Sequence, residues 1–185
     1  LAGITVAYLP ELHEAEIYCT QRLLNFAYGH LPEPKGMERM LRNAQKESGI
    51  EYSTQQSAAI RAAATEQVLL ITGGPGTGKT TILKGILSLL GQMQLKCLLA
   101  APTGRAAKRM TETTGYEAQT IHRLLEFKPP QGYQRNADHP LDGDVLIVDE
   151  AFYRVKRVNE ICHTYERGQY PIINRTTLLN ILSSL

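Results

Sequence analysis

A glycine-rich stretch, Gly73 to Thr80 (GGPGTGKT), constrains the fold more than any other feature of this 185-residue chain. It follows the apolar run Val68 to Thr72, which has the uninterrupted pattern of a buried parallel strand. The residues after it place apolar side chains at helical spacing: Ile82, Leu83, Ile86, Leu87 and Leu90. A strand, a glycine loop ending in Lys-Thr and a helix, in this order, predict a P-loop α/β fold.

The rest of the pattern extends this fold. Two more apolar runs, Cys97 to Ala101 and Val145 to Val148, predict further buried strands. Helices are expected at Thr103 to Thr114 and at Thr120 to Glu126, and a polar loop with Pro and Gly at Lys128 to Pro140. Strands that alternate with helices predict a parallel sheet flanked by helices.

The chain divides into three parts by its pattern. We expect residues 1–50 to form a small, mainly helical lead-in, residues 51–151 the P-loop domain, and residues 152–185 a helical tail without an assigned role. In the lead-in, Ile4 to Leu9 is a candidate strand. Helices are expected from Leu12 to Phe26 and from Met37 to Lys46 in the lead-in, and in the tail around Val155 to Cys162 and Leu178 to Leu182.

The composition is that of an ordinary globular protein, with 43% hydrophobic residues and a net charge of +2. The three cysteines, Cys19, Cys97 and Cys162, are far apart and form no Cys-x-x-Cys pair, so we expect reduced thiols in a cytoplasmic protein. No apolar run approaches the roughly 20 residues that a membrane helix needs.

The glycine stretch fits the phosphate-loop pattern G-x-x-x-x-G-K-[ST] in full. Glycines let consecutive backbone N–H groups point inward, and the start of the following helix adds its positive dipole end. Lys79 is expected to reach the β- and γ-phosphates, and the Thr80 hydroxyl to hold Mg²⁺. The predicted ATP-binding residues of the loop are Gly74, Pro75, Gly76, Thr77, Gly78, Lys79, Thr80 and Thr81.

An acidic pair, Asp149-Glu150, ends the strand that begins at Val145. An acid at this position in a P-loop enzyme holds Mg²⁺, so Asp149 is a predicted metal ligand. Glu150 is the predicted general base that polarises the attacking water. Lys79 and Glu150 are the two predicted catalytic residues. The alternative is that Asp-Glu only begins a surface loop.

Three further stretches carry a resemblance to a known family: STQQSAAI from Ser53, LLAAPTGRAA from Leu98 and TIHRLL from Thr120. They resemble motifs of superfamily 1 helicases, and the closest likeness is to RecD-like DNA helicases. The segments YLPELHEAEIYCTQRLL and QRNADHPLDGDVLIVDEA are similar to the same group. The resemblance covers roughly residues 5–151 and implies a first RecA-like motor domain at 51–151.

The first stretch resembles the helicase glutamine motif, in which the residue matching Gln56 hydrogen-bonds the adenine edge. A side-chain amide suits adenine because it donates and accepts hydrogen bonds at once. Ser53 and Gln56 also have the spacing of a capping box, so Gln56 is equally suited to cap its own helix. The resemblance favours adenine.

The second stretch resembles a motif that contacts single-stranded DNA at the carboxyl end of a strand. The resemblance implies DNA-binding roles for Pro102, Thr103, Gly104 and Arg105. A turn at a strand end is where α/β sheets bind ligands, and Thr103, backbone amides and the cations around Arg105 suit a phosphate. The alternative is a solvated helix start with ordinary surface charges, in which Arg105 is structural.

The third stretch resembles a motif that places His122 and Arg123 near the DNA backbone. His122 could also stack on a base. A single His on a short helix is more often structural, and that alternative stays open.

By resemblance, such proteins hydrolyse ATP to move 5′ to 3′ along one DNA strand and open the duplex, and they act in DNA repair and recombination. Their later motifs and second RecA-like domain have no match after Ala151. An absent arginine finger costs about 10³–10⁵ in rate. We therefore expect this chain alone to bind Mg-ATP without unwinding DNA. The alternatives are another P-loop ATPase of the AAA+ type and a stand-alone nucleotide-binding regulatory module.

Overall fold

The computed structural model describes residues 10–27, 29–73, 76–136, 138–149 and 177–183. Five predicted features lie outside these residues: the strand at Ile4 to Leu9, the helix around Val155 to Cys162, and the site residues Gly74, Pro75 and Glu150. No helix of the described part combines the length and apolar character needed to cross a membrane.

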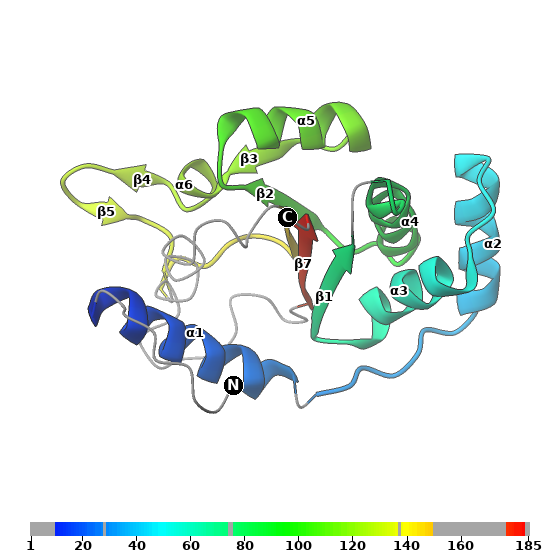
Figure 1. Cartoon of the computed structure of the whole chain (residues 1–185), viewed down its shortest axis with the longest axis horizontal. Helices are drawn as coiled ribbons and strands as arrows, with labels where there is room; N and C mark the ends of the chain where they lie inside the picture. The colour runs from blue at the N-terminus through cyan, green and yellow to red at the C-terminus, as the bar shows by residue number, and fades with distance from the viewer. Residues whose placement is uncertain (1–9, 28, 74–75, 137, 150–176, 184–185) are drawn as a thin grey trace.

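The described chain is built around a five-stranded sheet, in which every neighbouring pair of strands is parallel (Figure 1). The order of the strands is β1-β7-β6-β2-β3. Their bounds are Val68–Gly73 for β1, Cys97–Ala101 for β2, Ala118–Thr120 for β3, Val145–Asp149 for β6 and Thr177–Ser183 for β7. The predicted α/β fold with a parallel sheet flanked by helices is confirmed.

The helix that we expected around Leu178 to Leu182 is wrong. These residues form β7, which lies between β1 and β6 and pairs with both. Periodicity alone cannot separate a short apolar run in a strand from one in a helix. Two neighbouring strands offer β7 a full set of backbone hydrogen-bond partners, and a helix at that position would leave both edges of the gap unpaired. The parallel sheet therefore extends beyond residue 151.

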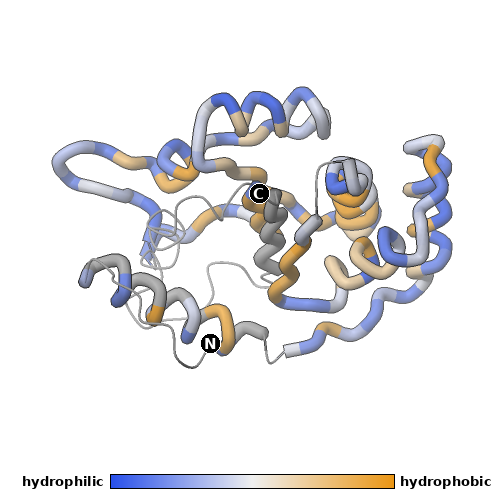
Figure 2. The backbone as a smooth tube through the Cα atoms, viewed as in Figure 1, coloured by the Kyte–Doolittle hydropathy of each residue, from blue (hydrophilic) through white to orange (hydrophobic). Residues whose placement is uncertain are grey.

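Six helices surround the sheet in the described chain. The expected helices at Leu12 to Phe26, Met37 to Lys46, Thr103 to Thr114 and Thr120 to Glu126, and the one after the glycine loop, are present, with ends that differ by at most three residues. Their bounds are Pro10–Ala27 for α1, Met37–Ser48 for α2, Thr54–Thr65 for α3, Lys79–Gln92 for α4, Gly104–Thr114 for α5 and Ile121–Leu124 for α6. Figure 2 shows that apolar residues concentrate along α4 and β1, whereas α5 is mostly polar.

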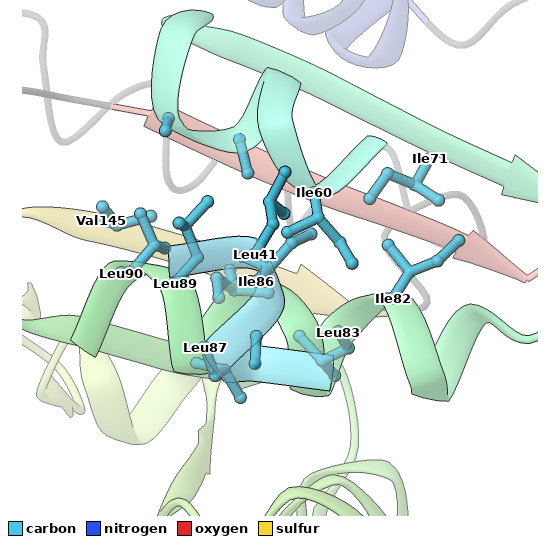
Figure 3. Packing of buried hydrophobic residues seen from close by; sticks show 14 of the residues in the cluster. Leu41, Ile60, Ile71, Ile82, Leu83, Ile86, Leu87, Leu89, Leu90 and Val145 are labelled. Atoms are coloured by element: carbon cyan, nitrogen blue, oxygen red, sulfur yellow. The ribbon is translucent and has the colours of Figure 1, made fainter. Parts of the chain in front are cut away.

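The largest core cluster lies on one face of the sheet, where α4 packs on the strands, α3 packs on α4, and α2 covers α4 from outside. Figure 3 shows Leu41 of α2, Ile60 of α3 and Ile86 of α4 close together in this cluster. Ile60 and Ile86 are fully buried. This packing fixes the positions of α3 and α4, which carry the predicted adenine-binding and phosphate-binding residues.

Strand β6 contributes to two cores by strict alternation. Val145 and Ile147 face the cluster under α4, whereas Leu146 and Val148 face a second cluster beneath α6. All four are buried, as expected of a strand covered on both faces. The loop predicted at Lys128 to Pro140 contains part of a short antiparallel hairpin.

The hairpin consists of β4 (Phe127–Lys128) and β5 (Gly132–Tyr133). It projects from the sheet on the side of the molecule opposite α2 (Figure 1). The predicted helix Thr120 to Glu126 is shorter than expected because Thr120 ends β3 and caps α6. Neither β3 nor the hairpin was predicted, since two- and three-residue strands are too short to show a period.

Candidate nucleotide-binding site

The glycine loop connects the carboxyl end of β1 to the start of α4, as its sequence predicts. Gly76 and Gly78 have φ angles of 75° and 81°, a left-handed backbone that residues other than Gly rarely adopt. Gly78 is the N-cap of α4, and it has no side chain to accept a hydrogen bond from the first turn. The first backbone N–H groups of α4 therefore suit an anion, aided by the helix dipole.

Lys79 folds back over this loop, and its ammonium donates a hydrogen bond to the Gly73 carbonyl oxygen. A Cβ atom at Gly73 would lie 2.6 Å from the Thr77 hydroxyl oxygen, so the loop is wound too tightly there for a side chain. The Thr80 side chain is exposed and that of Thr81 is half-buried. These residues fit a triphosphate: a glycine backbone, the Lys79 ammonium and the Thr80 hydroxyl next to it.

Asp149, the last residue of β6, lies at the same edge of the sheet as the loop. It is in register with Ile181 of β7, which is in turn in register with Ile71 of β1. Neighbouring strands lie roughly 4.8 Å apart, so Asp149, two strands away, lies about 10 Å across the sheet from β1. Its level along the strands is that of Ile71, two residues before Gly73. The sheet therefore brings the predicted metal ligand and the predicted phosphate loop to one edge.

Gln56 forms the capping box that its spacing predicts. Its backbone N–H donates to the Ser53 hydroxyl at 3.2 Å, and its side-chain oxygen accepts from the Ser53 backbone N–H at 2.9 Å. The other end of the amide points to the phosphate loop, because Gln56 Nε2 lies 2.5 Å from where a Cβ atom would stand on Gly78. Capping thus uses the amide oxygen and leaves the donor group beside the loop, which is compatible with the adenine role.

A cleft of about 470 Å³ opens at this place. Ser53, Gln56 and Ala59 of the α3 region form one wall, and β1 from Leu69 to Gly73 forms another. Lys79 and Thr77 close its end at the phosphate loop. The cleft has the position and the mixed apolar and polar lining that a nucleotide next to a phosphate loop needs.

The predicted DNA-binding residues Pro102 to Arg105 join β2 to α5. Pro102 is buried, whereas Thr103, Gly104 and Arg105 are exposed. The Thr103 hydroxyl accepts a hydrogen bond of 3.2 Å from the Ala106 backbone N–H and so caps α5. The structure therefore gives Thr103 a structural role, and Arg105 stands at an exposed helix start at the same sheet edge.

His122 lies in an aromatic cluster with Phe127 and Tyr133. Its ring is 5.4 Å from that of Phe127, edge to face, and 5.8 Å from that of Tyr133. Phe127 is 42% exposed, which is high for a large apolar side chain. The sequence reading missed Phe127 and Tyr133; the signal was a pair of aromatic residues on either side of the turn Pro129 to Gly132.

Comparisons with known proteins identify relatives of this chain. A family model described as "AAA domain" matches residues 56–164. The chain is 44% identical over 98 residues to the "ATP-dependent RecD2 DNA helicase" of Deinococcus radiodurans, a match that covers 53% of this chain and 14% of that protein.

Two further relatives come from a bacterium and a bacteriophage. The "RecBCD enzyme subunit RecD" of Mycolicibacterium smegmatis is 36% identical over 121 residues, covering 52% of this chain and 22% of the relative. The "ATP-dependent DNA helicase dda" of Enterobacteria phage T4 is 43% identical over 107 residues, covering 57% and 23%. The match thus spans less than a quarter of each relative's length. Because the family model spans more than half of this chain, the chain belongs to the AAA domain family and is related to RecD-like DNA helicases, as its sequence indicated.

Proposed function

We propose that this chain is the ATP-binding motor domain of an ATP-dependent DNA helicase, which couples ATP hydrolysis to movement on single-stranded DNA and duplex unwinding. The observation that carries the proposal is that the predicted nucleotide-binding features meet at one edge of the sheet. The glycine loop, the start of α4, Asp149 and the cleft beside Gln56 all lie there. The similarity to the RecD and Dda helicases supports the same activity.

In this proposal the residues of the loop divide the work of holding Mg-ATP. The Lys79 ammonium leaves the Gly73 carbonyl and binds the β- and γ-phosphates, while the backbone from Gly74 to Thr81 surrounds them. The Thr80 hydroxyl and the Asp149 carboxylate hold Mg²⁺, which when bound neutralises charge that develops on the phosphate oxygens. Glu150 accepts a proton from the attacking water.

Gln56 binds the adenine edge in this arrangement. Ser53 holds the amide oxygen through its backbone N–H, so the amide plane is fixed before the nucleotide arrives. The amide NH₂ group then donates to a ring nitrogen of the base, and the amide oxygen keeps a second lone pair for the base amino group.

Single-stranded DNA contacts the same edge of the sheet further along. Pro102 to Arg105 and His122 lie at the starts of α5 and α6, which follow the neighbouring strands β2 and β3. Arg105, with the exposed Lys108 and Arg109 on the same helix, supplies positive charge for the phosphates. The His122 ring and the exposed Phe127 offer a face on which a base can stack.

A second RecA-like domain completes the site in the parent protein, which we place in the cytoplasm. That domain supplies the arginine that stabilises the transition state, a group that contributes about 10³–10⁵ in rate. This chain alone therefore binds ATP, turns it over slowly and does not unwind DNA.

The test is the ATPase rate of the intact parent with and without single-stranded DNA. DNA should raise the rate, and Lys79→Ala should abolish the stimulated rate. Lys84→Ala is the matched control, because Lys84 is an exposed lysine on the same helix, and it should keep the rate. Turnover that is indifferent to DNA would instead favour another kind of P-loop ATPase.

A further inference from the structure

Helices α3 and α4 approach each other at two glycines, Gly78 at the N-cap of α4 and Gly85 within α4. Gly78 and Gly85 are seven residues apart, which places them on the same face of the helix. A Cβ atom on Gly78 would lie 2.5 Å from Gln56 Nε2, and one on Gly85 would lie 2.5 Å from Ile60 Cδ1. Gln56 and Ile60 are four residues apart and so share one face of α3.

The contact at Gly85 has no room to relax. Ile60 is fully buried, so its side chain cannot swing into solvent. The Tyr52 hydroxyl oxygen would lie 3.0 Å from the same Cβ atom and Ile60 Cγ1 3.1 Å from it, which closes the space from two sides. Gln56 is only half-buried, so the contact at Gly78 can yield by a small movement of the amide. The spacing of the two helices is therefore set at Gly85.

This spacing controls the place of Gln56. Gln56 stands one turn from Ile60 on α3, and the capping box with Ser53 fixes its amide relative to the helix start. A shift of α3 at Ile60 thus carries the amide away from the phosphate loop. Gly85 itself is six residues beyond Lys79, or about 9 Å along α4, and does not enter the loop.

We infer that Gly85 is a positioning residue: the absence of a side chain there lets α3 stand close enough to α4 for Gln56 to meet the base of a nucleotide held by the phosphate loop. This inference rests on the adenine role proposed for Gln56. It assigns base selectivity to a residue that touches neither base nor phosphate.

The experiment compares three Mg²⁺-loaded ligands on the 185-residue chain: ATP, GTP and inorganic tripolyphosphate. Tripolyphosphate needs only the phosphate loop, whereas the ratio of ATP to GTP affinity reports the base contact. In Gly85→Ala we expect tripolyphosphate affinity to stay within about twofold and the ATP-to-GTP ratio to fall about fivefold or more, the size of one lost hydrogen bond.

Two variants control for general effects of the change. Gly91→Ala adds a methyl group to the same helix where only the Tyr116 hydroxyl is near, at an ordinary 3.8 Å, and it should leave all three affinities unchanged. Adding Ile60→Val to Gly85→Ala removes Cδ1, the atom nearest to the new methyl group, and should restore at least half of the lost ratio.

The outcomes separate this inference from the proposed function. A folded Gly85→Ala chain with an unchanged ATP-to-GTP ratio overturns the inference, and so does equal loss of ATP and tripolyphosphate. If Gly85→Ala does not fold, Ile60→Val alone serves as the test: α3 can then settle closer to α4, and a ratio that stays unchanged overturns the inference. Gln56→Ala tests the adenine role itself, because a normal ratio in that variant removes the proposed base contact whatever Gly85 does.

Discussion

Helices α4 and α5 both begin at the carboxyl edge of the sheet, but their first turns are satisfied in different ways. Thr103 caps α5 by accepting a hydrogen bond from the Ala106 backbone N–H. Ser53 and Thr120 do the same for α3 and α6. At α4 the N-cap is Gly78, which has no side chain for this role.

A glycine cap alone does not mark a ligand site, because Gly36 caps α2 in the same left-handed way; at α4 the cap stands beside Lys79 and the glycine loop. A helix leaves its first N–H groups without partners inside the helix, and a side-chain cap or an anion can satisfy them. Where Ser or Thr provides the cap, the residue has a sufficient structural reason to be there. At α4 the glycine cap, the adjacent Lys79 and the tight loop all fit a phosphate better than they fit a plain helix start.

The strongest test of this difference between α4 and α5 is a variant of α4 with a negatively charged N-cap. Gly78→Asp places a carboxylate where the phosphates would bind, and like charges at about 4 Å cost several kcal/mol at an effective dielectric constant near 20. We expect ATP affinity to fall by roughly 100-fold or more, measured by titration of the chain.

Gly78→Asn is the matched control for that variant. Asn has nearly the same shape, tolerates the left-handed backbone of residue 78 and carries no charge. It should lose clearly less affinity than Gly78→Asp. Equal losses in both variants would mean that shape, not charge, excludes the ligand, and the repulsion expected between the Asp carboxylate and the phosphates would be wrong.

A second prediction concerns Cys97, which begins β2, the strand that leads to Thr103 and α5. Burial raises the pKa of the Cys97 thiol to about 11, and the nearby Asp144 carboxylate adds to the rise. From its ordinary value of 9.0 the thiolate fraction at pH 8 falls about 100-fold. Iodoacetamide should alkylate Cys97 about 100-fold more slowly in the folded chain than in urea, as peptide mass spectrometry would measure.

The same shift gives the dependence of stability on pH a definite sign. The folded chain holds the thiol proton more tightly than the unfolded chain, so the contribution of Cys97 to stability is complete below pH 9. It is lost as the pH rises through about 11. If Cys97 is labelled as fast in the native chain as in urea, β2 does not shield it from solvent. The strand would then not hold the start of α5 in place.

Thr103 tests the capped side of the comparison. Thr103→Ala removes the hydroxyl that accepts from Ala106, and loss of such a cap costs about 1 kcal/mol of stability. Urea unfolding should show this loss, and Thr103→Ser, which keeps the hydroxyl, should not. If DNA affinity is the same in all three chains, Thr103 acts as a cap only and its predicted DNA contact is wrong.

The same comparison explains what the sequence could reveal. The strand, glycine loop and helix from Val68 to Leu90 were readable because each step needs a particular residue type at a particular place. Gln56 and Thr103 remained ambiguous because capping and ligand binding use the same hydrogen-bonding groups, and the structure shows both capping bonds. Gly85 gave no signal, since its meaning depends on Ile60, a residue 25 positions away in another helix.

The structures of the segment Thr177 to Ser183 and of the hairpin at Phe127 were not predicted, for a different reason. A seven-residue segment with four apolar residues takes its structure from its neighbours, and only the gap between β1 and β6 makes it a strand. The two-residue strands of the hairpin have no period at all. Both lie where tertiary contacts outweigh local pattern.

The smallest expected effect belongs to Arg105, at the exposed start of α5. A guanidinium that meets a DNA phosphate releases about one counterion, so Arg105→Ala should reduce the slope of log affinity against log salt by about 1, with a loss of only a few-fold at moderate salt. Binding of a fluorescent oligothymidylate at several salt concentrations would measure both. Arg42→Ala is the control, because Arg42 is also exposed but lies on α2, across the molecule from the hairpin, and should leave the slope unchanged (Figure 1). If the two variants lower the slope equally, the charge of α5 acts only through the overall field of the protein. The start of α5 would then be a capped helix end and not a DNA-binding site.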